Sequence, residues 1–240
     1  MPSELERAIT TFRRALLANE RRAASAMVQA YGQSWVEISA QIAQIQRDLS
    51  GVNDPALIYR QRYLMALRQQ VAQKLAEFAS LAEASTLVTQ RAAIIAAASN
   101  AATLADIVSG GGTQAYFTRL PQEAIESLVG FASDGSPLNQ LFAELFDYAD
   151  DITDTFAAGL AAGLNPRDIA AELRRAYGVP LVRALVIART ETLRAYREAT
   201  WQSYQNNSDI ISGWIWISAA DRRSCVSCIA MHGSRHRLDE

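Results

Sequence analysis

Hydrophobic residues recur every three or four positions along most of the chain, which is the spacing of an amphipathic α-helix. In the first 50 residues this pattern comprises Leu5, Ile9, Phe12 and Leu16, then Val28, Tyr31, Trp35, Ile38, Ile42, Ile45 and Leu49. A second set comprises Leu64, Leu67, Val71, Leu75 and Phe78. Ser50-Gly51 indicates the end of the first helix, and Asp54-Pro55 indicates the N-cap and first turn of the next. Because the link is short, the pattern predicts a long antiparallel helical hairpin.

A third helix is predicted to begin at a cap on Ser85 or Thr86 and to run through an alanine-rich stretch to about Val108. The triplet Gly110–Gly112 then breaks the chain. No Lys-Ser or Lys-Thr follows it and no strand precedes it, so it is not a phosphate loop. We interpret it as a hinge that closes a first domain, residues 1–110.

Residues 111–164 form a second predicted region, with short helices beginning at Pro121 and near Pro137. The apolar face of the second helix comprises Phe142, Leu145, Ala149, Ile152 and Phe156. Its opposite face carries Glu144, Asp147, Asp151 and Asp154. Clustered carboxylates can bind a divalent metal, but carboxylates on the polar side of an amphipathic helix favour a face that meets solvent or a partner.

The third predicted region, residues 165–240, opens with the helix-start signal Asn165-Pro166. Gly178-Val179-Pro180 indicates the end of that helix, and another is predicted from about 181 to 204. Its stripe comprises Val182, Leu185, Arg189, Leu193, Tyr196, Thr200 and Tyr204. Arg189 on this side requires a partner if it is buried: it either binds a carboxylate or carbonyl groups in the core, or it is a binding residue at a groove. Glu191, Arg194 and Glu198 are predicted to form ordinary surface pairs.

The pattern changes after Asn207, where residues 210–217 are rich in Ile and Trp and are apolar on both sides. This predicts a strand covered on both faces. The fold class expected is therefore mainly α, with a long N-terminal helical hairpin, a helical bundle and a small C-terminal α+β module.

Composition and charge exclude several classes of protein. Half of the residues are apolar and a fifth are charged, which is typical of a folded protein rather than a disordered one. Two cysteines in 240 residues exclude a disulfide framework. The longest uncharged run, between Arg91 and Asp106, is too short to span a bilayer, and no secretory signal follows Met1, so we expect synthesis in the cytoplasm and no membrane partner.

The net charge of −2 gives no overall basic footprint for nucleic acid. The charge is uneven, with eight acidic groups and one basic group in residues 111–165. The arginines of the C-terminal third are mixed with acidic residues, so DNA contact is expected to be secondary. This uneven distribution suits a protein that docks onto others.

All cysteines and histidines of the chain lie within twelve residues, as Cys225, Cys228, His232 and His236. A Cys-x-x-Cys turn can hold two thiolates on one tetrahedral zinc ion, and histidines can supply the remaining ligands. The gap from the Cys pair to His232 is shorter than in common zinc modules. Three other interpretations stay open: a tight turn with two free thiols, a redox pair, and a Cys/His nucleophile.

A set of short motifs in the last third resembles a known family. Ala188-Arg189-Thr190-Glu191-Thr192 lies on a helix and is followed by Trp214-x-Trp216, then by Arg222-Arg223-Ser224-Cys225-x-x-Cys228 and His232-Gly233. In this order and spacing they resemble the phage head morphogenesis family, minor head proteins similar to the F protein of phage Mu. The resemblance covers about residues 155–240 and singles out Arg189, Glu191, Trp214 and Trp216 as structural or interaction residues.

The resemblance implies a structural role rather than an enzymatic one. Such proteins are minor virion components near the portal vertex that assist head assembly and DNA packaging or delivery. Expected partners are the portal protein or inner capsid proteins, and the expected location is the virion after assembly in the host cytoplasm. The alternative is a zinc-dependent nuclease or hydrolase centred on Cys225, Cys228, His232 and His236.

Overall fold

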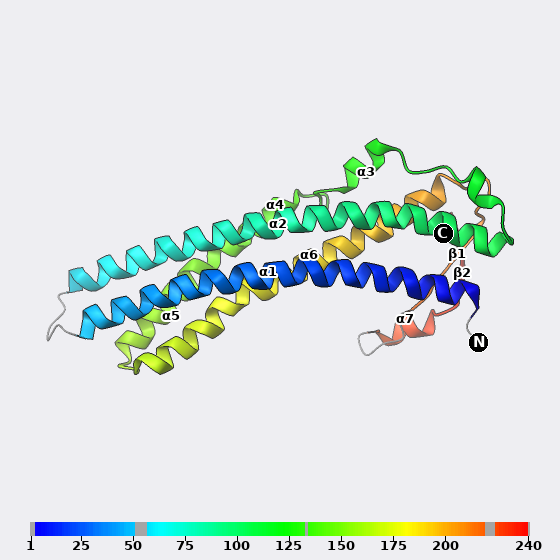
Figure 1. Cartoon of the computed structure of the whole chain (residues 1–240). Helices are drawn as coiled ribbons and strands as arrows, with labels where there is room; N and C mark the ends of the chain where they lie inside the picture. The colour runs from blue at the N-terminus through cyan, green and yellow to red at the C-terminus, as the bar shows by residue number, and fades with distance from the viewer. Residues whose placement is uncertain (1–2, 51–56, 133, 219–223, 240) are drawn as a thin grey trace. The chain divides into compact units, whose positions relative to one another are not determined.

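The chain is mainly helical, in a computed structural model that describes residues 3–50, 57–132, 134–218 and 224–239. The elements in chain order (Figure 1) are α1 Glu4–Ser50, α2 Leu57–Ser109, the 3-10 helix η1 Thr113–Tyr116, α3 Gln122–Leu128, α4 Leu138–Ala143, the 3-10 helix η2 Glu144–Asp147, α5 Tyr148–Ala161, α6 Pro166–Gln205, β1 Gly213–Ile215, α7 Val226–Ala230 and β2 Arg235–Arg237. The predicted class, mainly α with a small β-containing part near the C-terminus, is confirmed. The predicted cap at Asp54-Pro55 lies outside the described residues.

The helices are distributed over two compact units. The bundle unit consists of Arg14–Arg91 and Val129–Arg194. The terminal unit consists of Met1–Arg13, Ala92–Leu128 and Ala195–Glu240. The long helices α1, α2 and α6 each contribute residues to both units.

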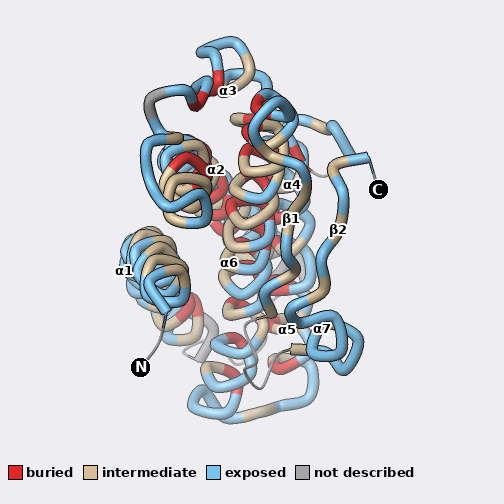
Figure 2. Tube along the Cα trace, turned by 90° about the vertical axis from the view of Figure 1, so that its right-hand side faces the viewer, coloured by how far each residue is buried: buried red, intermediate tan, exposed pale blue. Residues whose placement is uncertain are grey.

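In the bundle unit α1 and α2 pack against each other in opposite directions, as the predicted hairpin requires. The rings of Tyr31 and Phe78 lie 4.5 Å apart. Later in α1 and earlier in α2, Lys74 Nζ lies 2.8 Å from a carboxylate oxygen of Glu37, so the two helices run in opposite directions. The hydrophobic pattern predicts this interface but is wrong at one position. Val28 is half exposed, whereas its neighbour Met27 is fully buried. Figure 2 marks the buried positions of these helices in red.

Segments α4, η2 and α5 complete the bundle unit with the apolar face that the pattern predicted. All five members of that face are buried: Phe142, Leu145, Ala149, Ile152 and Phe156. The carboxylates on the opposite side are exposed, and two acidic residues of this region pair with neighbouring helices, Asp150 with Arg68 and Glu144 with Arg183. The expected single helix is divided, because the 3-10 helix η2 separates α4 from α5.

Two predicted helix breaks are wrong. α2 continues through Ser85 and Thr86, and the Thr86 hydroxyl donates to the carbonyl of Ala82, 2.7 Å away, within the same helix. No separate third helix therefore begins there. α6 likewise continues through Gly178 and Pro180. Proline removes one helical hydrogen bond, a cost that tertiary packing can outweigh, and Pro180 is buried.

The predicted start of α6 is confirmed by its cap. The side-chain Oδ1 of Asn165 accepts hydrogen bonds from the backbone N–H groups of Arg167 and Asp168, at 3.1 and 3.0 Å. These donors have no partner within the first turn of a helix, so an asparagine at this position satisfies them.

In the terminal unit, α2 ends at the glycine triplet. Gly110, Gly111 and Gly112 all have positive φ angles, between 82° and 103°, which glycine adopts without strain. The Asp106 side chain accepts hydrogen bonds from the N–H groups of Thr113 and Gln114 just beyond. The triplet therefore redirects the chain at a helix end, and its role as a hinge stays a prediction.

A buried asparagine joins two other segments of the terminal unit. Asn207 follows α6, and its side-chain oxygen accepts from the N–H of Thr118 at 2.6 Å. Its amide nitrogen donates to the carbonyls of Thr118 and Ser203, at 3.0 and 2.8 Å. A small core of Ala101, Ala102 and Phe117 forms nearby, with Tyr204 and Ile211 packed against it.

The predicted covered strand is wrong in both length and burial. β1 has three residues and pairs antiparallel with β2, in the register Gly213↔Arg237, Trp214↔His236 and Ile215↔Arg235. Ile215 and Ile217 remain 42% and 46% exposed. A strand is buried on both faces only where other layers pack above and below its sheet, and the exposure of Ile215 and Ile217 shows that they are not covered in this way.

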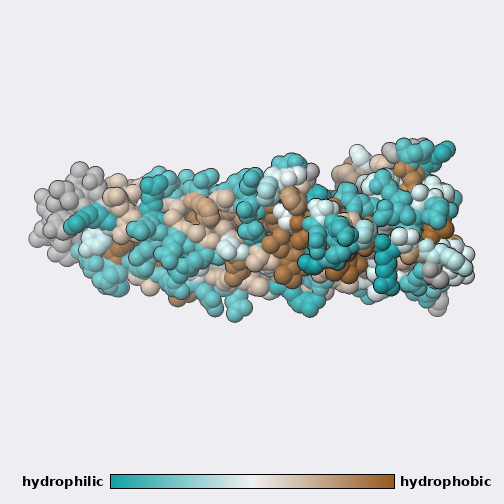
Figure 3. Space-filling view, turned by 90° about the horizontal axis from the view of Figure 1, so that it is seen from above, coloured by the Kyte–Doolittle hydropathy of each residue, from teal (hydrophilic) through white to brown (hydrophobic). Residues whose placement is uncertain are grey.

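Apolar surface remains on the long helices. Val36, Met65 and Val88 are 66%, 72% and 72% exposed. Figure 3 shows hydrophobic side chains exposed among hydrophilic ones on one face. Arg62–Ser109 in α2 is also apolar and long enough to cross a membrane by those two criteria alone. Core helices of other proteins can meet the same criteria, but only 22% of the most apolar window of this segment is buried, so the absence of a membrane partner stays a prediction.

Candidate functional site

Arg189 bridges α6 to α1 in the bundle unit. Its guanidinium lies 3.0 Å from a carboxylate oxygen of Glu20. The Arg189 side chain is 38% exposed and that of Glu20 is 19% exposed, so this ion pair is partly shielded from water. The structure contains the carboxylate partner, and Arg189 also lines a groove of about 250 Å³ with Glu20, so its role as a binding residue stays a prediction.

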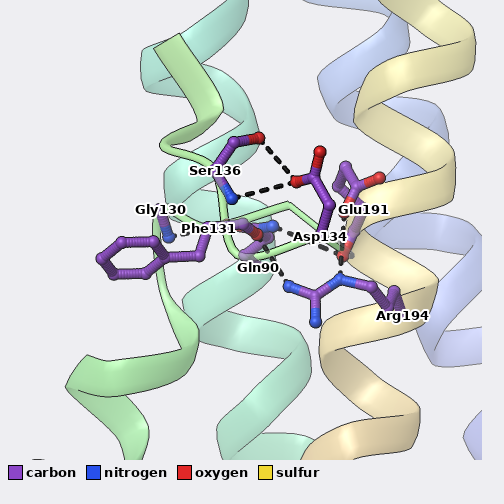
Figure 4. Close-up of polar contacts among 7 residues, drawn as sticks. All are labelled: Gln90, Gly130, Phe131, Asp134, Ser136, Glu191 and Arg194. Carbon is purple, nitrogen blue, oxygen red and sulfur yellow. Dashed lines mark hydrogen bonds and ion pairs between the residues drawn. The ribbon is translucent and has the colours of Figure 1, made fainter. Parts of the chain in front are cut away.

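Glu191 is not a surface residue, in contrast to the prediction. It is 5% exposed, and one of its carboxylate oxygens receives a hydrogen bond from Arg194 Nε at 3.0 Å. Another nitrogen of the same guanidinium donates to the main-chain carbonyl of Phe131 at 2.7 Å. Arg194 therefore neutralises a buried carboxylate and holds a distant loop at the same time (Figure 4).

Gln90 on α2 completes this polar cluster, and it is fully buried. Its side-chain oxygen accepts from the N–H of Gly130 at 3.0 Å, and its nitrogen donates to the carbonyl of Glu191 at 3.4 Å. Figure 4 shows Gln90 between the loop and the two helices. One amide side chain thus joins α2, α6 and the loop that follows Gly130.

The loop itself is closed by local bonds. Phe131 and Pro137 form an isolated antiparallel bridge. Asp134 accepts hydrogen bonds from the N–H and the hydroxyl of Ser136, at 2.9 and 2.6 Å. These bonds favour the charged form and hold the pKa of Asp134 below its ordinary value. We call Gln90, Glu191, Arg194 and residues 130–137 the tether cluster. Its side chains bind one another or main-chain groups of the same cluster. This arrangement holds the loop in place against α2 and α6.

Trp214 and Trp216 gather in the terminal unit, as part of an aromatic group. The Trp214 ring stacks on His236 at 4.4 Å, with Trp216 at 6.0 Å and Trp201 at 6.3 Å. Both indole N–H groups on the ribbon are buried without a hydrogen-bond partner among the described residues. Trp214 also lines an apolar cavity of about 400 Å³ with residues that include Ile9, Val108 and Tyr204.

Cys225 and Cys228 lie together at the start of α7. Cys225 is the N-cap residue, and its sulfur accepts a hydrogen bond from the N–H of Cys228 at 3.2 Å. The Cys228 thiol also donates to this sulfur, and these bonds lower the pKa of Cys225 while they raise the pKa of Cys228. Both thiols are free, with Cys225 exposed.

The two histidines have other contacts. His232 Nδ1 accepts from the N–H of Ser218 at 3.2 Å. His236 shares a hydrogen bond with the hydroxyl of Ser234 at 2.8 Å, in addition to its stack on Trp214. Within the described ranges, no three His, Cys, Asp or Glu side chains gather as a metal-binding group. Zinc at Cys225, Cys228, His232 and His236 stays a prediction.

Sequence reasoning missed Gln90, the 130–137 loop and Asn207. A signal for Gln90 exists, since the positions Ala82, Thr86, Gln90, Ala93 and Ala97 recur at helical spacing and are all buried. A polar residue within such a stripe of small residues is expected to need a partner across the interface. The loop partner carries no such signal, because it contributes backbone groups that any residue has.

Three features follow one another in the order that the resemblance required. They are the helix with Arg189 and Glu191, the ribbon with Trp214 and Trp216, and the turn with Cys225 and Cys228. Residues 150–240 match the Phage Mu protein F like family. The predicted resemblance over about 155–240 is confirmed. A comparison with the curated proteins and another with the solved structures found no match.

The Mu F-like region begins inside α5 and includes α6, β1, α7 and β2. It therefore contains Arg189, Glu191, Arg194, the ribbon tryptophans and the cysteine pair. The contacts of these residues extend beyond it, because Arg189 binds Glu20 and Glu191 binds Gln90. The helices that precede the Mu F-like region thus supply partners to the residues in it.

Proposed function

We propose that this chain is a minor head protein of a tailed bacteriophage, a structural component that acts in head assembly near the portal vertex. The observation that carries the proposal is the match of residues 150–240 to the Phage Mu protein F like family. On this proposal the chain is made in the host cytoplasm, becomes part of the virion and has no catalytic turnover of its own.

The character of the polar groups supports a structural role. Arg189 and Arg194 of the Mu F-like region each bind a carboxylate, and Gln90 binds two main-chain groups. These interactions join helices and loops to one another. The alternative of a zinc-dependent nuclease or hydrolase gains no support from geometry, since no group of three metal-binding side chains forms within the described parts of the chain.

The surface supports docking onto larger partners, for which we propose the portal protein or inner capsid proteins. The acidic face of α5 is exposed, and Val36, Met65 and Val88 present apolar side chains to solvent on α1 and α2. Exposed apolar residues beside charged ones are typical of protein contact surfaces. DNA contact is proposed as weak and secondary.

The test is reconstitution with the portal and capsid proteins of the same phage. We expect the chain to co-purify with portal rings or assembled heads, to appear in particle images near the portal vertex, and to show no hydrolysis of nucleic acid or esters. A chain that stays monomeric and does not bind portal rings or heads would contradict the proposal. Substrate turnover that is lost in Cys225→Ser would support the enzyme instead.

Variants can then locate the contact surface. Met65→Glu adds a charge to an exposed apolar position of α2, and Gln69→Glu adds the same charge one turn later at an exposed polar position. If α2 docks through its apolar residues, Met65→Glu weakens co-purification more than Gln69→Glu, which adds the same charge on the same face without removing an apolar side chain. The same comparison applied to Val36 and Val88 tests the other exposed positions.

A further inference from the structure

Cys225 and Cys228 lie three residues apart in one turn at the start of α7, with Cys225 exposed and Cys228 partly exposed. The Cys225 sulfur accepts a hydrogen bond from the backbone N–H of Cys228 at 3.2 Å. The residues around it leave it accessible, because Val226 and Ile229 are 84% and 50% exposed. Cysteines three residues apart in one turn, with the sulfur of the first against the backbone N–H of the second, lie close enough in the chain for a short disulfide loop to close.

We propose that Cys225 and Cys228 form a reversible intramolecular disulfide by exchange with small disulfides. Cys225 is the entry thiol, since it is the more exposed of the two and lies at the start of α7, where a small disulfide can reach its sulfur. Cys228 is less exposed and resolves the mixed disulfide. This proposal is independent of the proposed function.

The exchange balances as two displacements. The Cys225 thiolate attacks one sulfur of oxidised glutathione, whose S–S bond breaks, and one glutathione leaves and takes a proton from water. Cys228 loses its proton to water and attacks the Cys225 sulfur, so the mixed disulfide breaks and the second glutathione leaves. The protein has then lost two electrons and two protons, and one small disulfide has become two thiols.

The experiment uses the full chain in buffers of set reduced-to-oxidised glutathione ratio, with a chelator present. Samples are quenched in acid, alkylated and weighed intact. We expect one transition, from a chain that takes two alkyl groups to a chain that takes none and is lighter by two hydrogens. Persistent double alkylation in excess oxidised glutathione, or oxidation mainly to mixed disulfides or covalent dimers, would overturn the proposal.

Two matched variants test the roles of the thiols. Cys228→Ser lacks the resolving thiol, so Cys225 is expected to accumulate as a stable mixed disulfide with glutathione. Cys225→Ser is expected to form its mixed disulfide more slowly. Equal rates would overturn the assignment of Cys225 as the entry thiol.

A parallel sample without chelator addresses the predicted metal. Thiols that oxidise equally with and without chelator support the redox pair. A chain isolated with one zinc ion, whose thiols resist oxidation until chelator is added, would overturn the proposal and favour the zinc site. Circular dichroism of both serine variants confirms that the fold is retained.

Discussion

The hydroxyl of Tyr31 in α1 donates a hydrogen bond to the main-chain carbonyl of Tyr177 in α6, and the two rings stack with centroids 4.5 Å apart. Both residues are buried in the bundle unit. The carbonyl belongs to the stretch of α6 just before Pro180, where the helix lacks one backbone donor. This contact therefore fastens α1 to the part of α6 that the sequence marked as a helix end.

Tyr31→Phe removes the donor and keeps the ring. We expect a loss of about 1–2 kcal/mol in the free energy of unfolding, because a buried acceptor loses its partner. Tyr116→Phe is the control, since that side chain is 78% exposed, and it is expected to change stability by less than about 0.5 kcal/mol. Urea denaturation measures both, and equal effects in the two variants would contradict the importance of the bond.

The same tyrosines predict a loss of stability in alkali. Burial raises the pKa of Tyr31 above its ordinary value of 10.0 and raises the pKa of Tyr177 to about 12. Because both are raised in the folded state, their contribution is complete below pH 10 and is lost as pH rises through the folded pKa values. Unfolding free energy should therefore fall from pH 10 towards 12, and less steeply in Tyr31→Phe. A parallel decline in both proteins would contradict this.

The bundle unit shows which part of the fold can be predicted from sequence. Leu67, Val71, Leu75 and Phe78 are large, apolar and regularly spaced, so their buried face follows from hydrophobicity alone. The buried face of the second half of α6 is different, because it contains Ala184 in the bundle unit and Ala195 and Ala199 in the terminal unit. The pattern selected the larger Val182 instead, which is 62% exposed. Small residues give little hydrophobic contrast, so periodicity does not identify an interface built from them.

The candidate site also has features that can be predicted from the sequence and features that cannot. Arg189 could be assigned a carboxylate partner, but which carboxylate depends on how α1 packs against α6. The sequence predicts the pairing of Glu191 with Arg194 on the same helix but not the burial of Glu191. That burial depends on contacts of α6 with α2 through Gln90 and with the loop through Phe131. His236 stacks on Trp214 only because β1 and β2 pair in one register. Contacts across distant segments carry no local signal.

Two helical glycines of the bundle unit predict opposite effects on stability. A Cβ on Gly32 of α1 would meet nothing within 4 Å, whereas a Cβ on Gly159 of α5 would lie 2.9 Å from Cγ1 of Ile169. Gly32→Ala is expected to stabilise the chain by about 0.5–1 kcal/mol, because it reduces the entropy of the unfolded state. Gly159→Ala is expected to destabilise it by about 1–3 kcal/mol through overpacking.

Thermal unfolding distinguishes the two glycine variants, and a second background tests the cause. Ile169→Ala removes the atom that the new methyl group would meet, so adding Gly159→Ala to it is expected to cost much less. A cost that stays the same in this background would show that Ile169 is not the obstacle.

Gln90→Ala tests the link between α2 and the loop after Gly130. The change leaves the N–H of Gly130 without its acceptor and opens a cavity at a fully buried position. We expect a loss of about 2–3 kcal/mol, against less than about 0.5 kcal/mol for Gln69→Ala at an exposed position of the same helix. Equal losses in chemical denaturation would be inconsistent with a buried tether.

Arg194→Ala tests the charged half of the tether cluster. The Glu191 side chain is 7% exposed, so loss of the guanidinium leaves a buried carboxylate without its cation and the Phe131 carbonyl without its donor. We expect a loss of about 2–4 kcal/mol, because an unpaired buried charge costs more than the pair contributes. The stability of Arg194→Lys should lie between that of the unchanged chain and that of Arg194→Ala. Its ammonium group keeps the positive charge but cannot reproduce the planar guanidinium that reaches both acceptors.

Two further measurements separate this mechanism from a general loss of packing. Glu191→Gln removes the charge, so the double variant with Arg194→Ala should lose less stability than the sum of the two single changes. Amide hydrogen exchange should speed up in residues 130–137, which Arg194 holds through Phe131, before it does so in the core around Leu75. Arg197→Ala, at an exposed position of the same helix, should change neither quantity. Strict additivity, or exchange that rises equally in loop and core, would mean that Arg194 supports the bundle only by packing.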